Sequence, residues 1–334
     1  MNDKTFIIAE AGANHNRNIE QAKKLIDIAK SSKADAVKFQ TYSSETLYAK
    51  NTPNFAGYTN LNKLIKDIEL PREWQKELKS YCDEKNIEFM STPFDELAVK
   101  ELIDIGVKRL KIAGFESTDP RFVKMVASSG LPLIVTSGIG GTLEKINDTL
   151  TWIRSVNKDA DITILHGNNA YPTPYCDSNL RQITEIINKY PDIKVGFSDH
   201  TEGILMAPVA VALGAKVVEK HFTLSRKLPG PDHPFAIEPE ELEQMIFNIR
   251  IVENSINKKS SEFSNSEKSF TRGMRSVVAK TDIQEGTVIE EHMITTMRPL
   301  IEDSIPAIKY YDILGSKTNK FIQKDTLLFF RDFV

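Results

Sequence analysis

The sequence is poor in the features that mark secreted, membrane-bound and nucleic-acid-binding proteins. It has only two cysteines, Cys82 and Cys176, so we expect no disulfide framework and a reducing cytoplasmic location. No apolar run approaches the length that spans a bilayer, and the first residues lead straight into a strand-like segment rather than a signal peptide. The net charge of −3 gives no reason to expect a nucleic-acid partner. We therefore expect a cytoplasmic globular protein that binds neither membranes nor nucleic acid.

Residues 195–233 hold the pattern around which the chain is organised. Two short apolar runs, Val195–Phe197 and Ala215–Val218, are each followed by a histidine, His200 and His221, and a stretch with helical spacing separates them. In parallel α/β folds the carboxyl ends of the strands carry the chemistry, so the two imidazoles are expected to be neighbours. Imidazole is the commonest protein metal ligand, and the pair predicts a divalent metal site. The alternative is that one of the two histidines caps a helix.

The rest of the chain repeats this alternation of strand and helix. Together with the two runs above, eight strands are predicted. The other six are Phe6–Ala9, Ala34–Phe39, Ile87–Met90, Val107–Ile112, Leu131–Val135 and Ile162–Leu165. Eight such units in residues 5–257 match the roughly 250 residues of a (β/α)8 TIM barrel. A doubly wound open sheet is the alternative, but no Gly-x-Gly-x-x-Gly follows the first strand.

Two segments depart from this repeat. Residues 42–70 form a long excursion after the second predicted strand, which is typical of a lid or another functional loop. Pro71 is predicted to open a helix that runs through Cys82.

The composition changes near the end of the predicted barrel. Residues 255–271 are polar and rich in serine, lysine and asparagine, which indicates a linker. From residue 275 the segments are short and separated by turns such as Glu285-Gly286, which predicts a small β-rich module. We therefore divide the chain into a catalytic barrel at 1–257, a linker at 258–274 and a β-rich domain at 275–334. A module of this size buries little apolar surface alone, so we expect it to pack on the barrel or on another chain.

Polar side chains gather at the predicted carboxyl ends of the strands. Lys38 and Lys111 are costly to bury without an anion, so each either pairs with an internal carboxylate, such as Glu10 or Glu116, or holds an anionic substrate. Hydroxyl groups are expected at the same level, from Thr92, Thr136, Ser137 and Ser198. Backbone amides near 138–140, at the start of a helix, would add to anion binding.

The remaining histidines and Cys82 have less distinctive settings. His15 and His292 lack obvious partners and are interpreted as surface residues, while His233 is assigned to a loop at the rim of the barrel. Cys82 is expected in the core.

Several longer motifs resemble the N-acetylneuraminate (sialic acid) synthase family, which includes the legionaminate and pseudaminate synthases. The motifs are IIAEAGANH, VKFQT, STPFD, LKIAGFE, YPTP, GFSDHTEG and VALGAKVVEKHFTLSRKLPGPDH. The resemblance covers the whole chain and implies that the module at 275–334 is the antifreeze-like (SAF) domain of that family. It also implies a TIM barrel that works as a homodimer with swapped C-terminal domains.

The resemblance further implies an activity. The family condenses phosphoenolpyruvate with an N-acylated aminohexose to a nine-carbon 2-keto-3-deoxy acid and phosphate, with a divalent metal such as Mn2+, or Mg2+ or Co2+. By motif, His200 and His221 correspond to the metal ligands. The phosphoenolpyruvate positions correspond to Lys38, Thr92, Lys111, Thr136, Asn169 and Ser198. The positions near the metal and the sugar correspond to Glu10, Gln40, Tyr171 and Asp232, and the arginine that reaches the partner's sugar site corresponds to Arg298.

The chain departs from the family pattern at a few positions, which keeps the acceptor sugar open. Gly114-Phe115-Glu116 stands where Ser-Gly-Glu is common, and Gly167, Ser225 and Leu300 also depart from frequent choices. Phe115 and Leu300 favour a less polar sugar pocket, so N-acetylmannosamine and the legionaminate and pseudaminate precursors all remain candidates. Two other functions are weighed: a 3-deoxy-ulosonate-phosphate-type synthase that uses a phosphorylated sugar, and a non-catalytic carbohydrate-binding protein.

Overall fold

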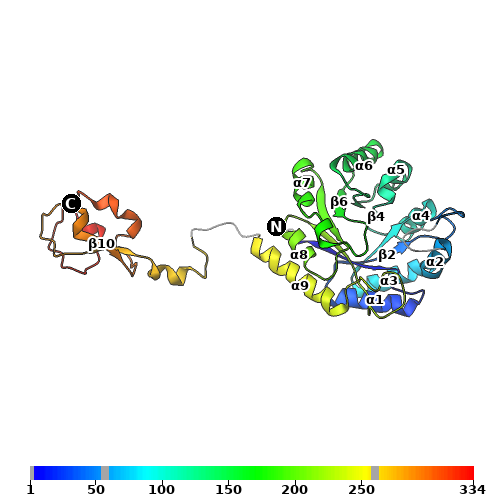
Figure 1. Cartoon of the computed structure of the whole chain (residues 1–334), viewed down its shortest axis with the longest axis horizontal. Helices are drawn as coiled ribbons and strands as arrows, with labels where there is room; N and C mark the ends of the chain where they lie inside the picture. Colours follow the sequence, from blue (N-terminus) through cyan, green and yellow to red (C-terminus); the bar gives the residue numbers. More distant parts are fainter. Residues whose placement is uncertain (1–3, 54–59, 257–262) are drawn as a thin grey trace. The chain divides into compact units, whose positions relative to one another are not determined.

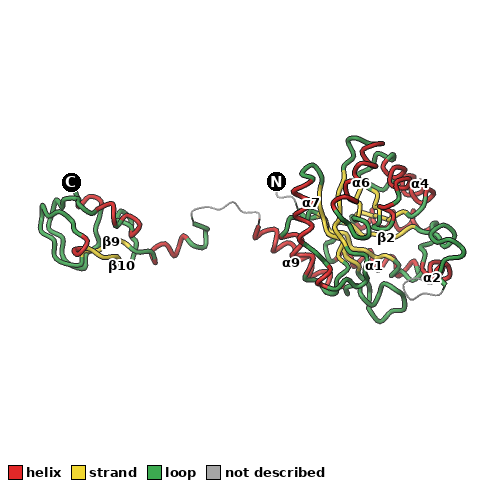
Figure 2. Tube along the Cα trace, turned by 45° about the horizontal axis from the view of Figure 1, so that its top comes forward, coloured by secondary structure: helices red, strands yellow, loops and turns green. Residues whose placement is uncertain are grey.

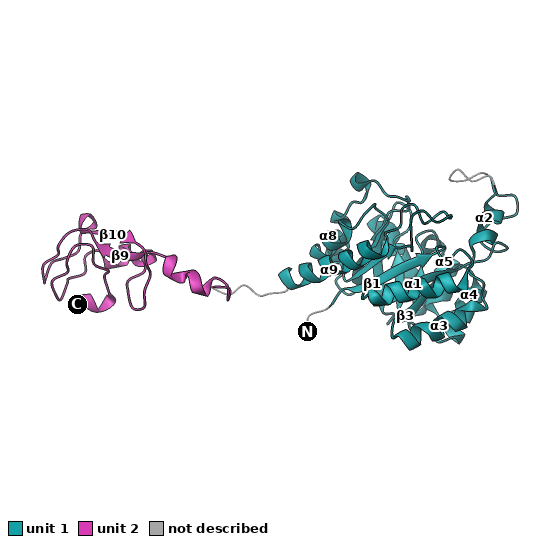
Figure 3. Ribbon diagram, turned by 90° about the horizontal axis from the view of Figure 1, so that it is seen from below, with its two compact units in different colours: residues 1–257 teal, residues 258–334 magenta. Residues whose placement is uncertain are grey.

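The protein divides into two compact units. The computed structural model describes residues 4–53, 60–256 and 263–334. One unit comprises residues 1–257 and the other residues 258–334 (Figure 3). Within the described ranges, none of the helices combines the length and the apolar character needed to cross a membrane.

The first unit is a closed parallel barrel. Its strands pair in the order β3-β2-β1-β8-β7-β6-β5-β4, and all seven of these pairings are parallel. Strand β3 also lies against β4, which closes the ring. The predicted (β/α)8 fold is therefore confirmed, and the open doubly wound sheet is ruled out. Helices surround the central strands (Figures 1 and 2).

All the strands but β4 end later than predicted, and five of the eight also begin later. The observed bounds are β1 Phe6–Gly12, β2 Ala36–Thr41, β3 Glu88–Pro93, β4 Leu110–Ile112, β5 Leu133–Thr136, β6 Ile162–Gly167, β7 Lys194–Asp199 and β8 Val217–His221. Seven of the eight extend past the apolar run into the polar residues, because these residues alternate in direction and still take part in the ladder. Site residues such as Lys38, Thr92 and His221 are thus part of the strands, whereas His200, Asn169 and Tyr171 lie in the loops that follow β7 and β6.

Nine helices of the described part belong to this unit. They are α1 Ile19–Ser31, α2 Leu61–Ile68, α3 Trp74–Lys85, α4 Glu96–Asp104, α5 Pro120–Ala127, α6 Leu143–Val156, α7 Arg181–Lys189, α8 Met206–Ala212 and α9 Pro239–Ile256. The helix predicted from Pro71 begins three residues later, at Trp74. The long excursion at 42–70 contains α2, and its residues 54–59 lie outside the described residues.

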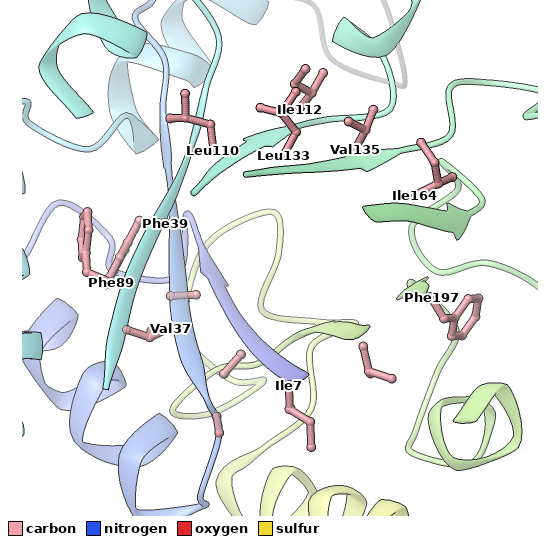
Figure 4. Close-up of a cluster of buried hydrophobic side chains, with 14 of the residues drawn as sticks. Ile7, Val37, Phe39, Phe89, Leu110, Ile112, Leu133, Val135, Ile164 and Phe197 are labelled. Atoms are coloured by element: carbon pink, nitrogen blue, oxygen red, sulfur yellow. The ribbon is translucent and has the colours of Figure 1, made fainter. Parts of the chain in front are cut away.

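Side chains on the strands point alternately outward and inward. Outward residues such as Ile7, Val37 and Phe197 pack with the helices in one large apolar cluster, part of which Figure 4 shows. A separate small cluster is made almost wholly of strand residues and fills the interior: Ile8, Ala36, Met90, Ile134, Leu165 and Val217, with Phe6 against it. Two residues further along the same strands come polar side chains that face inward above this apolar floor: Glu10, Lys38, Thr92, Thr136 and Glu219.

The second unit has its own small core. Strands β9 Ser276–Ala279 and β10 Ile294–Met297 pair antiparallel, and several isolated bridges hold the remaining loops. Buried apolar residues, among them Val277, Ile305 and Leu328, form its core. Part of the predicted linker at 258–274 is structured, because Lys268–Gly273 forms a 3-10 helix. Residues 257–262 of this region lie outside the described residues.

Candidate active site

One pocket lies at the carboxyl ends of the barrel strands. It is lined by Glu10, Lys38, Gln40, Thr92, Phe94, Lys111, Ala113, Gly114, Thr136, Asn169, Tyr171, Ser198, His200, Glu219 and His221. Eleven of the thirteen site residues predicted from the sequence are in this lining, which leaves Asp232 and Arg298. Glu219 is the charged member that the sequence interpretation did not single out.

The buried Lys38 is held on two sides. Its ammonium group lies 2.8 Å from Glu10 Oε2 and donates to Thr92 Oγ1 at 2.9 Å. Gln40 Nε2 donates to the other Glu10 oxygen at 2.8 Å, so the carboxylate bridges two neighbouring residues of β2. Burial raises the Glu10 pKa to about 7, although the nearby Lys38 acts in the opposite direction.

The second buried lysine, Lys111, has a different anion. Its ammonium group is 3.6 Å from Glu219 Oε1, and Lys38 lies 3.6 Å from the same oxygen. Burial lowers the Lys111 pKa, and the Glu219 charge opposes this effect. The internal pairing considered for the lysines therefore exists, but it involves Glu219 as well as Glu10. Glu116, the other carboxylate considered, has no oxygen within 4.0 Å of either ammonium group.

The two candidate metal ligands meet across β7 and β8. The rings of His200 and His221 lie 5.6 Å apart, centroid to centroid. Burial lowers the His200 pKa to about 4 and moves the His221 pKa well below its ordinary value, which favours the neutral imidazole that binds metals. His200 Nδ1 lies 2.5 Å from the Asn168 carbonyl, so it acts as the donor and Nε2 keeps the lone pair.

His221 presents an open ligand position. Its Nδ1 is buried without a hydrogen-bond partner in the described part of the chain. The nearest carboxylate is Asp232, whose Oδ2 lies 3.8 Å away and accepts from the Ala13 amide. Gly12 makes this approach possible, because it has φ +50° and a Cβ there would lie 2.7 Å from Asp232 Oδ2. Among the described residues no group of three or more His, Cys, Asp or Glu is arranged so that it could hold a metal ion.

An aromatic wall stands beside the imidazoles. Tyr171 packs on His200 with 4.2 Å between ring centroids, and Phe235 lies 5.4 Å from Tyr171 and 5.3 Å from His221. On the opposite side, Gly114 leaves room for the Asn169 amide, which a Cβ would approach to 2.8 Å. Phe115 is exposed.

One histidine interpretation from the sequence is wrong, and for His233 the structure adds burial to the predicted loop position. His15 is buried rather than on the surface: its Nδ1 accepts from the Arg17 amide and its ring lies beside Phe39. His233 is fully buried between Thr223 Oγ1 at 2.6 Å and Asn16 Oδ1 at 3.1 Å, so it ties the loop after β8 to the loop after β1.

The positions predicted for His292 and Cys82 agree with the structure. His292 is exposed, Cys82 is buried, and Arg298 follows β10 at an exposed position of the second unit.

Comparison with known proteins places the chain in a family. A model described as the NeuB family matches residues 25–261, and a SAF domain model matches residues 274–334. The chain belongs to the NeuB family. It is 36% identical to the N,N'-diacetyllegionaminic acid synthase of Campylobacter jejuni, over 97% of this chain and 99% of that protein. A pseudaminic acid synthase of the same species is 31% identical, over 96% of this chain and 94% of that protein.

A solved structure supports the NeuB assignment. The N-acetylneuraminic acid synthetase from Leptospira borgpetersenii, in complex with citrate, is 33% identical and superposes with a TM-score of 0.73. The match covers 80% of this chain and 90% of that chain. The resemblance inferred from the motifs is thereby confirmed at the level of family and fold.

Proposed function

We propose that this protein condenses phosphoenolpyruvate with an N-acylated aminohexose to a nine-carbon 2-keto-3-deoxy sugar acid and phosphate. The observation that carries the proposal is the pair of buried cations, Lys38 and Lys111, side by side in the same pocket as two neutral imidazoles. A buried cation pair suits a small, highly charged anion, and the related synthases named above make nonulosonic acids. A non-catalytic binding protein has no need for both groups together.

The lysines and hydroxyl groups would bind phosphoenolpyruvate. Thr136 Oγ1 is buried without a hydrogen-bond partner among the described residues, and so is Asn169 Oδ1, although Asn169 also carries an amide donor. Ser198 lies at the same level, 3.5 Å from Glu219. These preorganised groups stabilise the charge on the phosphate and carboxylate of the substrate.

A divalent ion, with Mn2+ preferred over Mg2+ or Co2+, would be held by His200 and His221. The residues fit such an ion, because both imidazoles are neutral by burial and His221 Nδ1 has no hydrogen-bond partner in the described part. When bound, the ion supplies a Lewis acid that polarises the aldehyde of the open-chain sugar. Asp232 and Tyr171 border the same space and would orient the sugar.

The chain's own residues then govern the bond changes. C3 of phosphoenolpyruvate bonds to the aldehyde carbon, water adds to C2, and the C2–O bond to phosphate breaks. Lys38 and Lys111 would hold the phosphate throughout, so that the leaving group keeps its charge partners. Glu10, fixed by Lys38 and Gln40, would face the sugar as a positioned carboxylate.

The acceptor would be N-acetylmannosamine or a 2,4-diacetamido-2,4,6-trideoxyhexose. Phe94, Ala113 and Tyr171 give the pocket an apolar wall, and the exposed Phe115 follows the lining residue Gly114. These side chains favour a sugar without a 6-hydroxyl. A phosphorylated sugar, as in a 3-deoxy-ulosonate-phosphate-type synthase, would need a further cation, and Lys38 and Lys111 are the only cations in the described lining.

We further propose a cytoplasmic homodimer in which the SAF domain of one chain covers the barrel of the other. The exposed Arg298 would then supply a fixed cation with directional donors to the partner's sugar site. The small core of this unit supports the proposal, because such a unit gains stability by docking.

The test is phosphate release from phosphoenolpyruvate in the presence of a panel of sugars and Mn2+. We expect release with an N-acylated aminohexose and a product mass equal to sugar plus pyruvate. Release only with a phosphorylated sugar would establish the 3-deoxy-ulosonate-phosphate activity instead. Sugar binding with no release from any acceptor would favour the binding protein.

A further inference from the structure

Glu219 is the one carboxylate shared by both lysines of the pocket. It projects inward from β8 and is itself buried. Its Oε1 atom lies 3.6 Å from Lys38 Nζ, 3.6 Å from Lys111 Nζ and 3.5 Å from Ser198 Oγ. No other carboxylate oxygen in the described part of the chain lies within 4.0 Å of both ammonium groups.

The two lysines depend on Glu219 to different degrees. Lys38 also has Glu10 at 2.8 Å and Thr92 at 2.9 Å, so its ammonium group is fixed without Glu219. For Lys111, Glu219 is the sole carboxylate within 4.0 Å among the described residues. Removing the Glu219 charge would leave the buried Lys111 beside a second cation, Lys38, and without a nearby anion of its own.

The 3.6 Å contacts are longer than an ordinary charged hydrogen bond, which spans about 2.7–2.9 Å. Glu219 therefore balances the charge of the two ammonium groups without saturating their donors. Its Oε2 atom has no hydrogen-bond partner in the described residues. The cluster is thus preassembled and still able to bind an anion.

We propose that Glu219 is a positioning residue that holds Lys111 next to Lys38 and so creates the anion site. This inference rests on the proposed function for the identity of the anion, phosphoenolpyruvate. Without Glu219, repulsion between the ammonium groups and the cost of burying Lys111 unpaired would move Lys111 away from the site.

Positioning and simple electrostatics predict opposite effects of Glu219→Gln on the affinity for phosphoenolpyruvate. A carboxylate near a bound anion repels it, so on charge alone Glu219→Gln would tighten phosphoenolpyruvate binding. If Glu219 positions the lysines, the same substitution weakens binding. The amide keeps the shape of the side chain, so the comparison isolates the charge.

The experiment measures phosphoenolpyruvate binding by calorimetry and steady-state kinetics on the full-length protein. We expect Glu219→Gln to raise the dissociation constant about tenfold or more, and to raise KM for phosphoenolpyruvate more than KM for the sugar. Glu219→Asp keeps the charge with a shorter reach, and we expect an intermediate loss. The matched control is Glu88→Gln, which removes the carboxylate that pairs with Arg109 at the amino end of β3 and should leave phosphoenolpyruvate affinity unchanged.

Equal or tighter binding by Glu219→Gln would overturn the proposal, as would a uniform loss of kcat with no change in KM. If Glu219→Gln does not fold, Glu219→Asp decides, and an unchanged dissociation constant for that variant overturns the proposal. Wild-type protein that binds phosphoenolpyruvate but releases no phosphate contradicts the proposed function, and the Glu219 comparison still stands on binding. Wild-type protein that does not bind phosphoenolpyruvate overturns both.

Discussion

Lys220 and Asp199 form an ion pair of 3.0 Å from which solvent is excluded. Lys220 also donates to the Thr201 carbonyl at 2.5 Å, and Asp199 accepts from the Thr201 amide and hydroxyl. The pair joins the carboxyl ends of β7 and β8 on their outward side. Asp199 directly precedes His200, and Lys220 directly precedes His221, so the pair fixes the backbone from which both imidazoles project inward.

Breaking this pair should destabilise the barrel strongly. Lys220→Met leaves the Asp199 carboxylate buried without its cation, and loss of one partner of a buried pair typically costs about 3–5 kcal/mol. We expect a large fall in the free energy of unfolding in urea. The double variant Asp199→Leu with Lys220→Met removes both charges and should recover part of the loss. A Lys220→Met protein with the wild-type urea midpoint would show that the pair adds nothing to stability.

Lys111→Ala should impair phosphoenolpyruvate use selectively. Loss of a charge-assisted contact costs about 1.5–3 kcal/mol, which corresponds to a roughly 10- to 150-fold rise in KM for phosphoenolpyruvate. KM for the sugar should change far less. Lys194→Ala is the matched control. Lys194 is exposed, is the first residue of β7 and pairs with Asp161. Unchanged phosphoenolpyruvate affinity in Lys111→Ala would make Lys111 a structural residue.

Metal removal should abolish activity. A chelator would take away the ion that we propose His200 and His221 hold, and added Mn2+ should restore turnover. His200→Ala and His221→Ala should each weaken Mn2+ binding, because each supplies one of few protein ligands. His292→Ala, an exposed histidine of the second unit, serves as the control and should bind Mn2+ as the wild type does. Full turnover in chelator-treated buffer would contradict the metal site.

Much of this architecture is predictable from the sequence, because the barrel repeats one local pattern. Apolar runs followed by polar residues identified all eight strands, and the strand ends placed Lys38, Lys111, His200 and His221 in one pocket. The strands predicted from apolar runs end too early, because a hydrophobicity pattern does not distinguish inward polar strand residues from loop residues. The period of two provides the correction, because it places Glu219 on the same face as His221.

Other features depend on contacts between distant segments. His233 binds Asn16, which is 217 positions earlier in the chain, and no local pattern signals that contact. His15 sits in a short loop that reads as polar surface, yet the loop folds over the barrel and buries the ring beside Phe39. The burial of both rings arises from tertiary packing rather than from secondary structure.

The final prediction concerns the proposed swapped homodimer. Its support is the small core of the SAF unit and the exposed position of Arg298. If Arg298 of one chain completes the other chain's site, Arg298→Ala and His221→Ala should each be inactive alone. Co-refolding the two chains should restore activity, because one site in each heterodimer combines an intact barrel with an intact Arg298.

The size of the recovery is part of this prediction. Random pairing makes about half of the dimers heterodimers, and one of their two sites is intact, so we expect about a quarter of the wild-type activity. The control is a mixture of His221→Ala and Lys111→Ala chains, whose lesions lie in the same barrel and cannot complement each other. If heterodimers of Arg298→Ala and His221→Ala form, as native mass spectrometry would show, and no activity returns, then the SAF domain serves its own barrel or Arg298 has no role in the site.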